Sequence, residues 1–319
     1  MSDTTSRKSN RVIGYLCALG AGATWGTTGP LSTGLYDLMP ATSIGFWRVL
    51  IGTIALVIWG VAFRRDLFKA DRKGWLIVGL GGGAMVALFE IAYQFAIAGA
   101  GVAGAAALLY TAPVIVAVLA RIVLKEALTS TRIILAVTVM IGVALTVTGG
   151  SNAGAEAARM GLTAGIAGGL LSALSYALTS LMGRWAAPRY GALKVLFLEA
   201  VGGVVLIWVA LAIWGRAPTA PPSGAAWRSL LGLAAGSVIL ANILFFGAMK
   251  RIEAAPASVA ATIEPVVGAI LALLLFSQRL TLLGWAGLLL VVVGVAAGYL
   301  LEGLKQQLDS EAEESGRPV

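Results

Sequence analysis

Four ionisable side chains stand in stretches of sequence that are otherwise long, apolar and uncharged: Arg48, Glu90, Glu199 and Glu264. A charge at the centre of a bilayer costs roughly 2.5–3.5 kcal/mol on insertion scales, so such residues face a solvated cavity or a partner of opposite charge. A carboxylate or a guanidinium in a cavity can bind a charged group of a small solute, and a carboxylate can also carry a proton. Because the chain has no histidine, proton chemistry near neutral pH falls to these carboxylates.

Arg48 and Glu90 stand at comparable distances from the ends of two successive apolar stretches. With a rise of about 1.5 Å per residue, the two side chains are predicted to lie at a similar depth in a bilayer and to pair. Two interpretations of the pair stay open. It either holds two helices together as a static bridge, or it takes part in binding or gating.

Aromatic residues follow two of the polar positions at helical spacing. Tyr93 lies three residues after Glu90, which puts a carboxylate and a phenol on one helix face, and Phe245 follows Asn242 in the same way. Such a stripe is typical of helix packing, but the polar neighbours also suit a cavity wall. We therefore expect Tyr93 and Phe245 to line a cavity. Trp25 and Tyr176 either line it too or lie in an interfacial aromatic belt.

Two prolines occur inside apolar stretches, and polar residues accompany both. Tyr110 comes shortly before Pro113, and Glu264 immediately precedes Pro265. Proline has no N–H, so it frees a backbone carbonyl and lets a helix bend, which predicts hinges at Pro113 and Pro265. Glu264 is the first choice for a protonation site or a site for a substrate amine. The alternative is an inert carboxylate that is hydrogen-bonded to helix ends.

The elements that position these residues are membrane spans. The chain of 319 residues is 59% hydrophobic and only 12% charged, with a mean hydropathy of +0.90, whereas soluble domains are roughly 45–50% apolar and 25% charged. Apolar stretches long enough to cross a bilayer predict ten helices, at 12–32, 41–63, 75–98, 102–122, 133–149, 161–183, 192–214, 229–249, 255–276 and 282–301. The third and fourth are separated by a tight turn that Gly99, Gly101 and Gly104 mark.

The distribution of basic residues predicts the orientation. With both termini in the cytoplasm, 18 of the 23 Lys and Arg residues lie inside. Four lie outside (Arg159, Arg216, Arg228 and Arg279), and Arg48 lies within a span. The positive-inside rule therefore favours a multi-pass protein of a bacterial-type inner (plasma) membrane with cytoplasmic termini. A cleavable signal peptide is the alternative for the N-terminus, but the uncharged run from Val12 to Tyr36 is too long for one.

An internal repeat organises the spans. At an offset of 151 to 152 residues, matched pairs include Trp25 with Tyr176, Arg48 with Glu199, Glu90 with Asn242, Tyr93 with Phe245, Pro113 with Pro265 and Gly142 with Gly294. The predicted division is a cytoplasmic tail at 1–11, a first five-helix repeat at 12–149, a periplasmic linker at 150–160, a second repeat at 161–301 and a cytoplasmic tail at 302–319, which its polar composition predicts to be disordered. Because five is odd, the repeats enter the membrane with opposite polarity. The predicted fold is thus an all-α polytopic membrane protein of two inverted repeats.

Several short motifs, taken in order, resemble the EamA-type family of the drug/metabolite transporter superfamily. They are Gly22-Ala-Thr-Trp25-Gly26, Phe46-Trp47-Arg48, Tyr110-Thr-Ala-Pro113 with Lys125-Glu126-Ala-Leu128-Thr129, and Glu264-Pro265. The resemblance covers roughly residues 12–301, and the family pattern usually has a Glu where this chain has Gln278. It implies a ten-helix fold and export of amino acids, including aromatic ones, or of related metabolites.

The function expected from the sequence is therefore secondary transport of a small molecule by alternating access between the two repeats. A lipid flippase or multidrug exporter of the same fold is the alternative. We expect no enzyme, because the spans lack the histidine, paired aspartates and clustered ligands that intramembrane hydrolases use. We likewise expect no cofactor, no metal and no nucleic acid partner, since the basic residues suit the lipid surface. Proton coupling, substrate identity and oligomeric state stay open.

Overall fold

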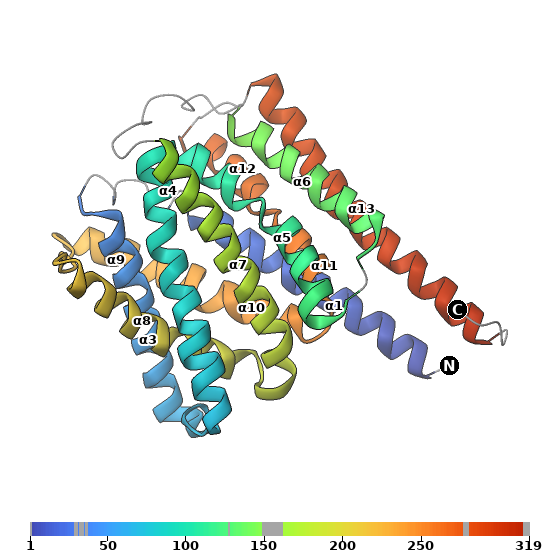
Figure 1. Ribbon diagram of the computed structural model, residues 1–319, viewed down its shortest axis with the longest axis horizontal. Helices are drawn as coiled ribbons and strands as arrows, with labels where there is room; N and C mark the ends of the chain where they lie inside the picture. The colour runs from blue at the N-terminus through green and yellow to red at the C-terminus, as the bar shows by residue number, and fades with distance from the viewer. Residues whose placement is uncertain are drawn as a thin grey trace.

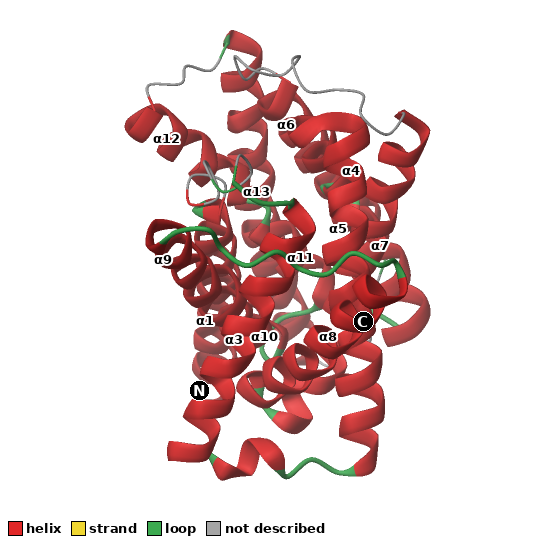
Figure 2. Ribbon diagram, turned by 90° about the vertical axis from the view of Figure 1, so that its left-hand side faces the viewer, coloured by secondary structure: helices red, strands yellow, loops and turns green. Residues whose placement is uncertain are grey.

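Helices make up the regular structure of the chain in the computed structural model (Figure 1), which describes residues 2–28, 31, 35, 38–126, 128–148, 162–276 and 281–314. Figure 2 shows helices and connecting loops and, within these ranges, no strand. The predicted linker at 150–160 and Gln278 lie outside the described residues. The all-α fold class is confirmed.

Each half of the chain supplies spans that are partly built from more than one helix. The first half contains α1 (Ser2–Gly26), α3 (Ala41–Phe63), the 3-10 helix η1 (Arg65–Phe68), the π-helix η2 (Gly74–Gly82), α4 (Gly83–Leu109), α5 (Ala112–Leu119), the π-helix η3 (Ala120–Leu124) and α6 (Ser130–Thr148). The second contains α7 (Leu162–Tyr190), α8 (Ala192–Ile213), α9 (Gly224–Leu233), the π-helix η4 (Ala234–Leu240), α10 (Ala241–Met249), α11 (Ala254–Ala261), α12 (Glu264–Phe276) and α13 (Leu282–Glu314). Consecutive elements such as α9, η4 and α10 form one span.

The surface of the helix bundle is apolar, as a bilayer requires. Ile58 and Leu289 are more than half exposed, while the buried core contains many alanines. Five stretches of the described chain are long and apolar enough to cross a membrane on their own: Thr42–Phe63, Gly74–Tyr93, Thr163–Tyr190, Ala192–Ile213 and Gly224–Met249. Small residues inside allow the helices to approach closely. Close packing matters in a bilayer because the hydrophobic effect does not drive helices together there.

The element α4 extends from Gly83 to Leu109, but the chain reverses its direction inside this range. The Ala96 nitrogen lies 2.8 Å from the position that a Cβ would take on Gly168, and the Leu108 Cβ lies 2.5 Å from that position on Gly169. A straight helix would separate Ala96 from Leu108 by roughly 18 Å, yet both meet neighbouring residues of α7. The reversal therefore lies between them, in the segment that contains the predicted turn at 99–104.

Contacts between the two halves repeat in matched positions. A Cβ on Gly52 of α3 would lie 2.7 Å from the Val238 side chain of η4, and one on Gly203 of α8 would lie 2.8 Å from the Val86 side chain of α4. Gly52 matches Gly203, and Val86 matches Val238, in the register read from the sequence. Each half thus packs a glycine against a valine of the other half, as expected for two copies related by a pseudo-twofold axis.

Each half also contains one broken span, and the breaks fall in the same register. In the first half one helix ends at Leu109 and the next begins at Ala112; in the second the corresponding residues are Ala261 and Glu264. Pro113 and Pro265 each follow the first residue of the new helix, where a missing N–H leaves no intrahelical hydrogen bond unmade. Helix geometry is therefore interrupted at the two predicted hinges.

The start of α1 and the end of α13 lie at one end of the bundle, on the right of Figure 1, which we call the terminal end. The end of α6 and the start of α7 lie at the opposite end. Helix α13 continues to Glu314, whereas the sequence analysis predicted disorder from residue 302. Glu, Leu, Lys, Gln and Ala favour the helix, and extending an existing helix needs no new nucleus.

Candidate functional site

A pocket lies where the two helix breaks meet. Its empty volume, which includes space open to solvent, is about 280 Å³. The lining comes from both breaks and from the middle of α7: Leu109, Tyr110, Ala112, Pro113, Tyr176, Ala261, Thr262 and Glu264. Because residues of both halves face the same space, a movement of one half against the other changes the shape of the pocket.

Glu264 brings a carboxylate to this pocket. It is the first residue of α12, where the N–H groups of the first turn have no intrahelical acceptor and the helix dipole favours a negative charge. The Tyr110 hydroxyl lies within hydrogen-bonding range of the carboxylate, and the positive charge of Arg48 acts on it. The carboxylate is therefore oriented but remains at the pocket surface, where it can meet a solute.

Three aromatic rings from three spans form a cluster beside the pocket. The ring centroid of Trp25 lies 6.1 Å from that of Tyr176 and 5.2 Å from that of Phe245, and the centroids of Tyr176 and Phe245 are 5.6 Å apart. The Trp25 Nε1 donates a hydrogen bond to the Ser237 carbonyl oxygen of η4 at 3.1 Å. Trp25 thus packs against the second half of the chain.

Arg48 and Glu90 form the predicted ion pair between α3 and α4. The Glu90 carboxylate packs against Gly45, where a Cβ would lie 2.6 Å from its Oε2. The charge of Arg48 also acts on Glu264, although neither member of the pair lines the pocket. This geometry is compatible with either interpretation of the pair. Tyr93 stacks on Phe89, with ring centroids 5.6 Å apart, and interacts electrostatically with Tyr110.

Two of the predicted site residues do not join this group. Glu199 is 2% exposed and lies against Gly82 at the contact of α8 with η2. Within the described chain its Oε1 has no hydrogen-bond partner. The Asn242 side chain donates to the carbonyl oxygens of Ser237 and Val238, at 3.0 and 2.9 Å, and so satisfies backbone groups of the π-helix η4.

Thr262 and the Ser237 carbonyl were missed by the sequence analysis. Thr262 lines the pocket and matches Tyr110 in the repeat register, so the register could have identified it. The Ser237 carbonyl accepts from both Trp25 and Asn242. It does so in a π-helix, and no sequence pattern marks that element.

A second pocket, lined mostly by apolar residues of α1, α5, α6, α11 and α13, has Arg132 as its charged residue among the described lining. It lacks the convergent polar groups of the first pocket. In the described part of the chain no cluster of three metal-ligating side chains occurs.

Comparison with known proteins identifies the fold twice within the chain. The model of the EamA-like transporter family matches residues 12–148 and, separately, residues 163–299. The protein belongs to the EamA-like transporter family. An uncharacterized transporter of Archaeoglobus fulgidus is 27% identical to this EamA-like chain over 254 residues, which are 79% of this chain and 84% of the relative.

A solved crystal structure supports the same architecture for this EamA-like protein. It superimposes with a TM-score of 0.75, covering 92% of this chain and 97% of that structure at 19% sequence identity. The protein is thus a multi-pass membrane transporter of ten spans in two repeats. Because each repeat has an odd number of spans, the two are inverted with respect to the membrane.

Proposed function

We propose that this protein is a secondary transporter that exports amino acids or related small metabolites by alternating access between its two inverted repeats. The observation that carries the proposal is the pocket between the two helix breaks, which both repeats line. Inverted-repeat transporters bind their substrates near the midplane at such interrupted helices, and one repeat moves against the other around the site.

The proposal gives each group at the pocket a role that its chemistry suits. The Glu264 carboxylate accepts hydrogen bonds from the ammonium group of the substrate, and Tyr110 orients the Glu264 carboxylate. The rings of Trp25, Tyr176 and Phe245 contact the apolar part of the substrate and attract its cationic end. Breaks at Pro113 and Pro265 provide the hinges.

The proposed setting is a bacterial-type inner membrane with both termini in the cytoplasm. The positive-inside bias supports it, because 18 of 23 basic residues then lie inside. The terminal end of the bundle then faces the cytoplasm. Export requires the pocket to open to this end, bind substrate, and release it at the other end.

Counterflow into proteoliposomes tests the proposal. Purified protein is loaded with an unlabelled amino acid, and uptake of the labelled compound is measured across a panel of amino acids and amines. We expect saturable counterflow for at least one amine-bearing compound and its loss in Glu264→Gln. Asp66→Asn, which removes an exposed acid outside the membrane, serves as the matched control and should transport normally.

The same vesicles separate the remaining alternatives. Equal flux with and without a pH gradient would argue against proton coupling through Glu90, Glu199 or Glu264. Movement of a fluorescent lipid probe without counterflow of any small solute would replace the proposal with a lipid flippase. Counterflow of unrelated apolar cations, with no amino acid among them, would indicate a multidrug exporter.

A further inference from the structure

Two ion pairs join the two repeats at the terminal end. Arg132, in the first turn of α6, pairs with Glu253, the residue immediately before α11. The Arg184 Nε of α7 lies 3.4 Å from the Glu126 Oε1, just after η3. In each pair one residue belongs to the first repeat and the other to the second. We call these four residues the terminal cluster.

Glu126 is the best-buried acid of the terminal cluster, with a side chain only 8% exposed. Its Oε1 accepts a hydrogen bond from the Ala254 N–H at 3.2 Å, so it caps the first turn of α11 from the other repeat. Lys125 has a left-handed backbone, with φ of 58°, which turns the chain so that Glu126 points back into the bundle. Arg184 also donates to the Met249 carbonyl oxygen at 2.9 Å. The cluster therefore joins five spans through η3, α6, α7, α10 and α11.

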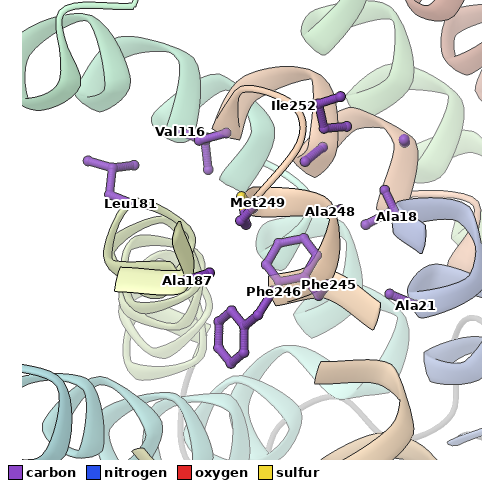
Figure 3. Close-up of a cluster of buried hydrophobic side chains, with 14 of the residues drawn as sticks. Ala18, Ala21, Val116, Leu181, Ala187, Phe245, Phe246, Ala248, Met249 and Ile252 are labelled. Carbon is purple, nitrogen blue, oxygen red and sulfur yellow. The ribbon is translucent and has the colours of Figure 1, made fainter. Parts of the chain in front are cut away.

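Buried apolar side chains of α5, α7 and α10 lie between the terminal cluster and the pocket. Val116, Leu181, Phe246 and Met249 belong to this buried plug (Figure 3), and the first, third and fourth have no exposed surface. Pro113 lines the pocket, and Glu126 lies thirteen residues further along the chain, roughly 20 Å at the helical rise. Along α7 and α10 the plug thus separates a solute in the pocket from the terminal end. Beside α5 the second pocket, which shares Pro113, reaches Arg132, so there the cluster itself closes the terminal end.

The repeat register places no ionisable residues at the equivalent positions of the opposite end. Glu126 corresponds to Gln278, Arg132 to Gly284, Arg184 to Thr33 and Glu253 to Gly101. The backbone architecture is duplicated, but this set of charges is not. Among the residues that the structure describes, ion pairs between the repeats are thus found at the terminal end.

We infer that the terminal cluster is a gate that must separate whenever the pocket opens to the terminal end, and that it biases the transporter toward the conformation closed there. The inference rests on the proposed alternating access. Because both pairs cross between the repeats, a relative movement of the repeats breaks them together. Removing one partner leaves the other charge poorly compensated and destabilises the closed state.

The charges around Glu126 give the gate a dependence on pH. Burial raises the pKa of Glu126, and Glu253 raises it further, whereas the Ala254 N–H, Arg184 and Arg132 lower it. Since burial is the largest effect, the pKa lies above its usual value, and protonation begins at a higher pH than for a free glutamate. Protonated Glu126 no longer attracts Arg184, so opening is expected to increase as the pH falls.

Cysteine accessibility tests the gate without any substrate. In a Cys17→Ala background, Ala120→Cys places a thiol on a residue of η3 that is 1% exposed. A membrane-impermeant maleimide then reports opening of the terminal end in purified protein. We expect Glu126→Gln, Arg132→Ala and Glu253→Gln each to raise the labelling rate about tenfold, equivalent to ~1.4 kcal/mol. The exchange Arg132→Glu with Glu253→Arg should return the rate toward that of the background.

Asp66→Asn is the matched control, because the Arg64–Asp66 pair lies outside the membrane and within one repeat. Its labelling rate should equal that of the background. Unchanged labelling in all three single variants, with unchanged melting temperatures, would overturn the gate. If Glu126→Gln does not fold, the partly exposed Glu253 and the charge exchange decide the question. Increased labelling without amino acid counterflow would keep the gate and reject the proposed substrate.

Discussion

The two helix breaks share one backbone design and differ in chemistry. Their helices end and restart at residues that correspond in the repeat register, and each has a proline at the second position of the new helix. However, Thr262 stands where the first repeat has Tyr110, and Glu264 stands where it has Ala112. The carboxylate is therefore present at one break only.

This difference shows what duplication provides and what later divergence adds. Duplication supplies the interrupted helices and a pocket that both repeats can reshape. A single acid supplies the charge that selects a ligand, and two identical acids in one small pocket would repel each other and favour protonation of one. The terminal cluster follows the same pattern, since its charges too occur at one end of a duplicated frame.

Moving the carboxylate from the second helix break to the first should have the largest effect on substrate binding. Glu264→Ala removes the charge that holds the substrate amine, and we expect binding to weaken by at least about 30-fold, since loss of a buried charge partner costs roughly 2–5 kcal/mol. Adding Ala112→Glu restores a carboxylate at the matched position and should recover part of the affinity. Binding is measured by isothermal titration or thermal shift with the best compound from the counterflow panel. A double variant as weak as Glu264→Ala would show that the two breaks do not face the pocket equivalently.

Replacing each proline tests whether the two helix breaks act equally as hinges. Pro113→Ala and Pro265→Ala each remove the ring that keeps the preceding and following helices apart, so the break can close into a stiffer, continuous helix, and we expect the counterflow rate to fall about tenfold in each, or ~1.4 kcal/mol in the barrier. Binding at equilibrium should change little, because the carboxylate remains. Initial rates over a range of substrate concentrations separate rate from affinity. A loss in only one variant would assign the movement to one repeat.

The matched glycine–valine contacts allow a test of packing symmetry. Gly52→Ala and Gly203→Ala each place a Cβ less than 3 Å from a valine of the other repeat. Overpacking of this kind costs typically ~1–3 kcal/mol, so both variants should melt earlier in detergent by similar amounts. Gly232→Ala, where a Cβ would meet nothing within 4 Å, is the control and should melt no earlier than the wild type. Unequal decreases in melting temperature would show that the two glycine–valine contacts contribute differently to stability.

The smallest effect is expected at the exposed contact between Asp71 of the first repeat and Tyr190 of the second. The Gly74 N–H and then the Tyr190 hydroxyl lower the pKa of Asp71. A lowered pKa contributes stability above the ordinary aspartate range, and this stability is lost as the pH falls through the folded-state value. Tyr190→Phe should slightly lower the melting temperature at neutral pH, and the difference should vanish in acid. A constant difference across the range would assign the effect to packing.

Much of the fold follows from the sequence because the membrane makes local composition decisive. Every backbone polar group in a bilayer needs an internal partner, so a long apolar stretch must be a helix. The prolines Pro113 and Pro265, which correspond in the repeat register, predicted the positions of both helix interruptions. The turn at 99–104 was readable for the same reason, since a single span cannot cover two bilayer crossings.

The composition of the site was less predictable, as Arg48 and Glu199 demonstrate. They correspond in the repeat, and both are ionisable residues inside spans. Arg48 pairs with Glu90, whereas Glu199 is enclosed at the contact of α8 with η2. Their matched depth stays a prediction, and their surroundings differ because the residues matched in the register, Glu90 and Asn242, diverged.

The sequence by itself determined which segments cross the membrane, where two of them break and how the halves correspond, because hydropathy, proline and spacing act along one segment at a time. Only the tertiary structure decided which side of each helix faces the pocket, since each residue turns the direction of its side chain by about 100° and packing against other spans selects the rotation. That selection brought Glu264, Tyr110 and Tyr176 together. It also joined Glu126 to Arg184, residues from different repeats whose meeting no local pattern predicts.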